Sequence, residues 1–217
     1  MAQVFPVEHG ERSEAAPAAS RIEKQPHTPV VAETAETEYR KGMNLIKRGS
    51  IPDAAIVLRA ALQIDPRHLL ARQALLSLLV DQQQWDEAMT VAAEGLVLDP
   101  KQAGWTMLVA RLQVERGEMS SALETLDQHA KYAASDADYL SFHALLLQKA
   151  KRYQEAVSHY RAALALRPSE GRWWYGLGLA LEANQQSVEA KEAYTQARAT
   201  ANLPADLATA VEQKLRP

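Results

Sequence analysis

Three kinds of residue in this sequence have types and spacings that chemistry can use: a short glycine motif, six histidines and several paired carboxylates. Gly176-Leu177-Gly178 has the form of a phosphate-binding loop. That mechanism needs a strand before the motif and a third glycine after it, so that backbone N–H groups surround the phosphate. The sequence indicates neither. We therefore interpret both glycines as close-packing positions inside a helix.

The histidines do not have the spacing of a metal site. A zinc-binding helix needs two histidines four residues apart together with a glutamate. No pair has that pattern among His9, His27, His68, His129, His143 and His159. The absence of cysteine excludes a disulfide, a thiolate metal site and a cysteine nucleophile. We interpret the histidines as core or surface residues.

Paired carboxylates such as Asp86-Glu87 and Glu189 with Glu192 are of the type that transfers protons in catalysis. Their expected positions, at turns and on outward helix faces, indicate solvated charge instead. The sequence therefore predicts no catalytic residue, no metal, no cofactor and no small-molecule substrate. We expect a protein that is not an enzyme.

Composition limits the class of partner. The chain has 217 residues, of which 47% are hydrophobic, and a net charge of -3. A mildly acidic chain without a run of basic residues has no field that attracts phosphates, so we expect no nucleic-acid binding. No apolar run approaches the roughly 20 residues of a membrane span, and the first 19 residues lack the apolar stretch of a signal peptide. Any membrane attachment is expected through an anchor upstream of this sequence.

Small side chains recur every 34 residues, and this period indicates the elements that must position everything else. The most regular column consists of Ala54, Ala88, Ala122, Ala156 and Ala190. A second column lies seven residues later, at Ala61, Gly95, His129, Ala163 and Ala197. Residues seven apart share one helix face, and small side chains there let a second helix approach closely. A 34-residue period fits one helix, a turn and a second helix, which bury their apolar faces only by stacking on neighbouring copies.

These positions resemble the tetratricopeptide repeat (TPR) family, and the best match is at Trp174, Leu177, Gly178, Ala190, Tyr194 and Ala197. The resemblance implies an all-α fold, an α-solenoid of five helix-turn-helix repeats at 35–68, 69–102, 103–136, 137–170 and 171–204. Leu207, Val211 and Leu215 form one apolar stripe, so we expect 205–217 to be a C-terminal capping helix. Four prolines and little apolar surface in 1–34 predict a disordered tail or linker. In the third repeat Ala134 replaces the terminal proline, and we expect a longer or irregular second helix near Tyr132.

In TPR proteins the first helix of each repeat lines an inner groove that binds a peptide or protein. The resemblance places on that wall Tyr39, Arg40, Met43, Gln73, Ser77, Met107, Arg111, Ser141, Leu145, Gln148, Arg172, Tyr175 and Leu179. This mixture suits an extended or helical peptide, with arginines available for carboxylates. The alternative is an ordinary solvated surface. The lysine and asparagine set with which chaperone-binding TPR domains hold a C-terminal carboxylate is missing.

A column of aromatic residues, Trp105, Tyr139 and Trp173, has two possible roles. Each residue can pack against the second helix of the preceding repeat, or the three can form an exposed ladder for a partner. Trp174 occupies the family's core position and is expected to be buried.

Longer stretches, at 171–182, 71–75, 203–207 and 211–215, resemble the C-terminal repeat region of the MshN family of biogenesis proteins for mannose-sensitive haemagglutinin (MSHA) type IV pili. The resemblance implies a bacterial scaffold for pilus or secretion-complex assembly, with a periplasmic array anchored in the inner membrane. The cytoplasm is the alternative location. Two other functions are a chaperone for secreted or apocytochrome substrates and an accessory arm of an enzyme complex.

Overall fold

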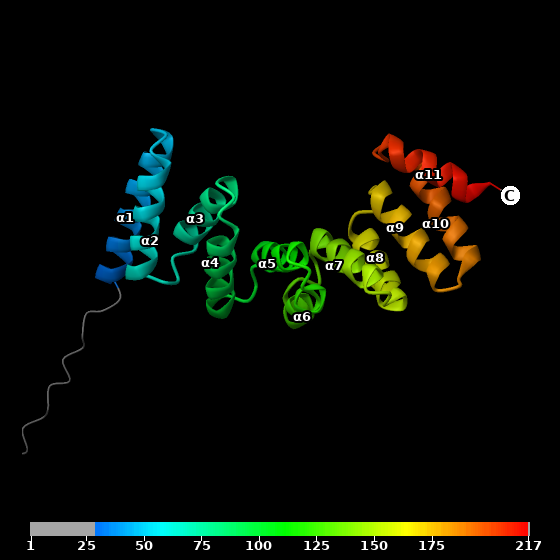
Figure 1. Ribbon diagram of the computed structural model, residues 1–217, viewed down its shortest axis with the longest axis horizontal. Coiled ribbons are helices and arrows are strands. Elements are labelled where there is room, and N and C mark those ends of the chain that lie inside the picture. The colour runs from blue at the N-terminus through cyan, green and yellow to red at the C-terminus, as the bar shows by residue number, and fades with distance from the viewer. Residues whose placement is uncertain (1–28, 217) are drawn as a thin grey trace, which may run out of the picture.

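The computed structural model describes residues 29–216, and in that range every regular element is helical, as predicted. Eleven α-helices and one 3-10 helix follow one another along the chain (Figure 1). Their bounds are α1 Pro29–Lys47, α2 Ile51–Ile64, α3 Leu69–Asp81, α4 Trp85–Leu98, α5 Ala103–Glu115, α6 Met119–His129, η1 Ala130–Tyr132, α7 Ala137–Lys149, α8 Tyr153–Leu166, α9 Gly171–Ala183, α10 Ser187–Ala199 and α11 Ala205–Leu215.

The helices form antiparallel pairs that are stacked side by side into a solenoid (Figure 1). The closest pairs are α1 with α2, α7 with α8 and α9 with α10. The first helices of neighbouring repeats also contact one another, as α5 does with α7 and α7 with α9. In the described part of the chain the second helices have no contact of similar extent. The first helices therefore line the inner side of the array, and the second helices lie on its outer side.

Small side chains allow the two helices of each pair to pack closely. The five alanines of the most regular column are at most 2% exposed. At Gly178 an added Cβ atom would lie 2.4 Å from Cε1 of Tyr194, and at Gly42 it would lie 2.9 Å from Leu58. The two helices of a repeat thus approach closely because no larger side chain separates them.

The turn inside each repeat uses the left-handed backbone region at one recurring position. Gly49 and Gly117 have φ of 78° and 79°, and the same position in the other repeats is occupied by Gln83, Lys151 and Gln185, with φ of 58°, 62° and 63°. Glycine adopts this conformation freely, whereas a residue with a Cβ atom is strained there.

Gln83→Gly is therefore expected to raise the free energy of unfolding by about 0.5 to 1 kcal/mol, since removing the left-handed strain exceeds glycine's entropy cost in the unfolded chain. Chemical denaturation measures the change. Gln82→Gly is the matched control, because Gln82 has φ of -87° and gains nothing from glycine. Equal effects at the two positions would contradict this prediction.

The apolar core forms two clusters that meet within α5. The N-terminal cluster runs from Ala54 to Val109, and the C-terminal cluster from Ala110 to Val211. In the third repeat α6 is short and is followed by the 3-10 helix Ala130–Tyr132, so this second helix is irregular, as one of the two expectations had it, and is not longer. At the C-terminal end α11 packs against α10, and Val211 is fully buried.

The predicted tail needs one correction. Residues 29–34 belong to α1, so the first helix begins before the predicted repeat start at 35. The rest of the predicted tail, 1–28, lies outside the described residues, as do His9 and His27. Among the described helices, none combines the length and the apolar character that crossing a bilayer requires.

Candidate functional site: an inner groove between α7 and α9

A groove on the inner side of the array lies between α7 and α9, the first helices of the last two repeats. It encloses a space of about 470 Å³. Its lining consists of Leu145, Gln148, Lys149, Tyr153, Tyr160, Arg172, Tyr175, Gly176, Leu179 and Ala183. The space has the volume of an ordinary ligand pocket, so it accommodates a few side chains of a partner and not a whole domain.

A glycine and a tyrosine shape the floor of the groove. A Cβ atom added to Gly176 would lie 2.6 Å from Cζ of Tyr160, so only glycine lets this ring reach α9. The Tyr160 hydroxyl donates to Oε1 of Gln148 at 3.3 Å. Burial raises the pKa of Tyr160, which keeps the phenol neutral. The Gly176-Leu177-Gly178 motif therefore serves packing, as predicted.

Tyr175 is held from behind by a second tyrosine. Its ring centroid lies 6.0 Å from that of Tyr194 on α10. The Tyr194 hydroxyl donates to Oε2 of Glu182 at 2.7 Å, and Nζ of Lys214 lies 2.6 Å from the same oxygen. Burial, followed by the bond to Glu182, raises the pKa of Tyr194. This support fixes the half-buried Tyr175 ring as one wall of the groove.

The charged side chains of the groove are all basic. Lys149 and Arg172 line it, and no lining residue is acidic. Within the described part of the chain, neither side chain has a hydrogen-bond or ion-pair partner. Unpaired cations beside an apolar surface favour a ligand that carries a carboxylate. The groove presents no nucleophile with an activating base, so the arrangement suits binding.

The structure brings five of the predicted groove residues together. They are Leu145, Gln148, Arg172, Tyr175 and Leu179. Residues 29–216 also hold no cluster of histidine and acidic side chains arranged for a metal ion.

The predicted residues nearer the N-terminus lie outside this groove. Gln73 and Ser77 are exposed on α3, Met43 is half-buried, and Arg40 pairs with Glu36 on its own helix at 2.7 Å. Tyr39 packs against the N-terminal core cluster, and its ring centroid lies 5.3 Å from that of His68. These side chains lie on the first helices, but they share no cavity with the five.

Two residues in the middle of the array have structural contacts, and a third is exposed. Ser141 is buried, and its hydroxyl donates to the backbone oxygen of Asp138 at 3.0 Å, so its placement on the groove wall was wrong. Met107 is partly buried against the C-terminal core cluster. Arg111 is exposed, with its guanidinium carbon 5.4 Å from the centre of the Phe142 ring, which extends the basic character of the inner side toward α5.

The aromatic column packs against preceding repeats, which is the first of its two possible roles. A Cβ atom added to Gly95 on α4 would lie 2.6 Å from Cζ3 of Trp105. The fully buried Tyr139 donates its hydroxyl to the backbone oxygen of Leu126 on α6. The guanidinium carbon of Arg167, at the end of α8, lies 4.5 Å from the centre of the Trp173 ring.

Trp174 was predicted to be buried, and this prediction was wrong. The residue is half-buried, and its indole nitrogen donates to the backbone oxygen of Pro168 at 2.7 Å. One part of the ring faces a cavity on the outer side of the array. The hydrogen bond holds the indole beside the start of α9 and away from the centre of the core.

Sequence reasoning missed half of the groove lining. The missed residues are Lys149, Tyr153, Tyr160, Gly176 and Ala183. The TPR pattern assigns the groove to the first helices, yet Tyr153 and Tyr160 come from α8, and Tyr160 reaches the groove past Gly176. The sequence offered one signal for these residues. A glycine inside a helix, here Gly176, indicates that a large side chain packs against it, and in the structure that side chain is Tyr160.

Comparisons with known proteins agree with this architecture. Two family models, both described as tetratricopeptide repeat, match residues 45–112 and 143–205, which together are more than half of the chain. A search of curated protein sequences gives no significant match.

Solved structures share the fold at low sequence identity. A crystal structure of MamA protein has a TM-score of 0.65 and 19% identity, and the match covers 76% of this chain and 91% of MamA. A MamA fragment from Desulfovibrio magneticus RS-1 has a TM-score of 0.60 at 18% identity, covering 75% and 92%. YrrB, described as a TPR protein with an unusual peptide-binding site, has a TM-score of 0.67 at 16% identity, covering 87% and 98%. At these identities the likeness concerns the fold alone.

Proposed function

Because the chain belongs to the tetratricopeptide repeat family, we propose that it is a non-catalytic scaffold that binds a segment of a partner protein in the groove between α7 and α9. The observation that carries the proposal is the combination of unpaired Lys149 and Arg172 with the apolar and aromatic wall of Leu145, Tyr175 and Leu179. Nothing in the groove supplies reaction chemistry, whereas every feature of it suits recognition.

The chemistry of the groove defines the segment that we propose. The two cations take an acidic side chain or a C-terminal carboxylate, and the apolar wall takes one or two apolar or aromatic side chains. The wall belongs to packed helices and is pre-organised, so the loss of conformational entropy on binding falls mainly on the peptide. The peptide-binding site named for YrrB agrees with this class of partner.

The biological setting is a further part of the proposal. Resemblance to the MshN family supports a role in the assembly of a type IV pilus or a related envelope complex, on the periplasmic side of the inner membrane. Crosslinking in cells of the native organism, with a photoreactive residue in place of Leu145, tests this setting directly. Recovery of a pilus or secretion component supports it. Capture of partners that belong only to the cytoplasm would contradict it.

Reversing both groove charges is expected to abolish capture of the groove partner. Lys149→Glu combined with Arg172→Glu replaces two cations with two anions, which repel the proposed carboxylate. We expect at least a tenfold loss of binding to the crosslinked partner, measured by calorimetry with the purified proteins. Both side chains are unpaired. The free energy of unfolding is therefore expected to change by less than about 1 kcal/mol.

A charge-matched control separates the groove from the net charge of the protein. Arg48→Glu with Lys101→Glu makes the same change of charge at exposed positions outside the groove. This control is expected to bind the partner as the unaltered chain does. If the groove variant binds normally, or if both variants lose binding equally, the partner does not occupy this groove. Turnover of any substrate by the purified chain would contradict the non-catalytic assignment.

A further inference from the structure

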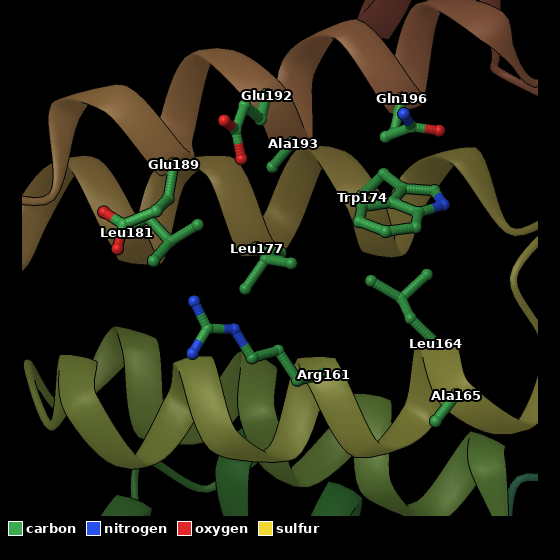
Figure 2. A pocket seen from close by; sticks show the side chains of 10 residues that line it. All are labelled: Arg161, Leu164, Ala165, Trp174, Leu177, Leu181, Glu189, Glu192, Ala193 and Gln196. Carbon is green, nitrogen blue, oxygen red and sulfur yellow. The ribbon is translucent and has the colours of Figure 1, made fainter.

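A cavity on the outer side of the array lies between α8 and α10, with α9 as its floor (Figure 2). It encloses about 530 Å³ and is separate from the inner groove, with which it shares no lining residue. The apolar part of its lining includes Leu164, Leu177, Leu181 and the exposed part of Trp174. The cavity therefore offers a surface on which an aliphatic chain can pack.

Charges of opposite sign face this cavity from its two sides. Arg161 reaches in from α8, and Glu189 and Glu192 face it from α10 (Figure 2). Glu189 accepts a hydrogen bond from Nε2 of Gln186 at 3.1 Å. The side chains of Arg161 and Glu192 have no hydrogen-bond or ion-pair partner among the described residues. The outer pocket thus holds charges that the protein itself leaves unpaired.

The same place three repeats earlier provides an internal comparison. Arg59 and Glu87 occupy the positions equivalent to Arg161 and Glu189 in the 34-residue period. They form a two-point ion pair across α2 and α4, with Nε to Oε1 at 2.5 Å and Nη2 to Oε2 at 2.8 Å. There the arginine of the first repeat and the glutamate of the second close the gap between α2 and α4. In the last repeats the equivalent gap is open.

Two substitutions along the repeat keep the later gap open. The position of Val91, which is buried in α4, is occupied by Ala193 in α10, a smaller side chain. Arg72, whose guanidinium is buried and bonded to the backbone oxygens of Val91 and Pro66, is replaced at the equivalent position by Trp174. The gap between α2 and α4 is thus filled by side chains of the protein itself, whereas the gap between α8 and α10 retains an unfilled space.

We propose that the outer pocket binds a segment of a partner protein that inserts a long basic side chain, lysine or arginine. The charged end lies at Glu189 and Glu192, the methylene chain packs on Leu177 and Trp174, and a neighbouring carboxylate of the segment pairs with Arg161. This site is a second one, independent of the inner groove.

The charge pattern favours a basic insertion over an acidic or an apolar one. Glu189 and Glu192 are three residues apart on one helix, so they share a face and repel each other. A cation between them relieves that repulsion, while the methylene chain that carries it extends along Leu177 toward Trp174 (Figure 2). A purely apolar ligand would cover all three charged groups without pairing them, which is costly.

A short capped peptide, acetyl-Ala-Glu-Ala-Lys-Ala-amide, is a direct probe. We expect it to shift the indole N–H signal of Trp174 in the nuclear magnetic resonance spectrum of the full chain in a saturable way. Replacing the lysine by norleucine, which keeps the methylene chain and removes the charge, is expected to weaken binding at least tenfold. Trp174→Phe assigns the signal.

Variants of the chain localise the site. Glu189→Gln with Glu192→Gln is expected to weaken binding at least tenfold, and Ala193→Val, which restores the residue found three repeats earlier, is expected to do the same by filling the pocket. Glu124→Gln, at the neighbouring gap beside α6, is the matched control and should bind within twofold of the unaltered chain. Circular dichroism verifies that each variant is folded.

Three outcomes would overturn the proposal: no saturable shift at Trp174, equal binding of the norleucine peptide, or unchanged binding by the double glutamine variant. The inner groove is tested with other residues and another ligand. Failure of one site therefore leaves the result for the other site intact.

Discussion

Replacing Ala156 with phenylalanine is expected to lower the free energy of unfolding by about 3 kcal/mol, at the upper end of what overpacking a core usually costs. Ala156 is fully buried in α8 and belongs to the column of alanines that lets the two helices of each repeat approach. A phenylalanine there must push α8 away from α7. That displacement breaks contacts on both sides of the fourth repeat, which lies inside the C-terminal core cluster.

Ala162→Phe is the matched control for this prediction. Ala162 lies on the same helix but is exposed, so the new ring reaches solvent, and we expect a change of less than about 0.5 kcal/mol. Guanidinium denaturation followed by circular dichroism measures both variants. Neighbouring repeats can unfold separately, so the transition should be checked for a second phase. A loss of less than about 1 kcal/mol for Ala156→Phe would show that the column tolerates bulk and would contradict the packing argument.

The second large effect concerns a buried histidine in a column that is apolar in the second, third and fifth repeats. His143 is fully buried on α7 at the position held by Leu75, Val109 and Leu177 in other repeats. Neither ring nitrogen makes a hydrogen bond. Its ring centroid lies 4.5 Å from that of His159 on α8. An uncompensated polar ring in the core is expected to make the fold sensitive to acid.

Several charges surround this ring. Burial is the largest cause of its low pKa, which is about 4, and the neighbouring His159 lowers the pKa further. Asp127 on α6, with Oδ1 3.3 Å from Nε2 of His143, acts in the opposite direction, as Glu155 does, whereas Arg152 lowers the pKa. Tyr139 meets the ring edge to face at 6.1 Å and carries no charge. Taken together, these contacts favour the neutral imidazole.

The direction of the pH effect follows from the lowered pKa. An unfolded histidine binds its proton near pH 6.5, whereas folded His143 does so only near pH 4. Between these values the unfolded state holds more protons, so stability falls as the pH falls. The contribution reaches about 3 kcal/mol near and below pH 4 and is absent above pH 7.

His143→Leu tests this contribution. The leucine restores the residue of the equivalent positions, so the difference in stability between variant and unaltered chain is expected to grow by about 3 kcal/mol as the pH falls from 7 to 4. Other groups that titrate in this range affect both chains equally. His129→Gln, which changes a half-buried histidine outside the pair, is the control and should show no growing difference. If the difference in stability between His143→Leu and the unaltered chain stays constant from pH 7 to pH 4, protonation of His143 does not destabilise the fold, and the prediction is wrong.

Much of the fold could be predicted from the sequence because packing in a repeat protein is local and recurrent. The 34-residue spacing of Ala54, Ala88 and their equivalents predicts helix pairs that nest through small side chains. The irregular turn after α6 was signalled by the missing proline at Ala134. The start of α1 was not predicted correctly, because residues 29–34 lie before the first repeat and carry no repeat signal. In the structure they extend the first helix of that repeat toward the N-terminus.

The sites depended more on tertiary structure. Placing the groove on the first helices located Leu145, Arg172 and Tyr175, because the periodicity shows which face of each helix points inward. It misplaced Ser141, whose small hydroxyl is satisfied inside its own helix, and it missed Tyr160, which reaches the groove only because Gly176 has no side chain. Such a pair of large and small residues has no fixed spacing in a sequence.

By itself the sequence determined the repeat length, the helical class and the faces that pack, since these follow from side-chain size and periodicity. Only the tertiary structure decided where the chain leaves space and charge unused. Arg59 with Glu87 and Arg161 with Glu189 are the same pair in sequence, yet the first closes a gap and the second faces an open pocket. Whether two side chains meet depends on the helices between which they lie and on the volume of every neighbour, and both are set only when the whole array is packed.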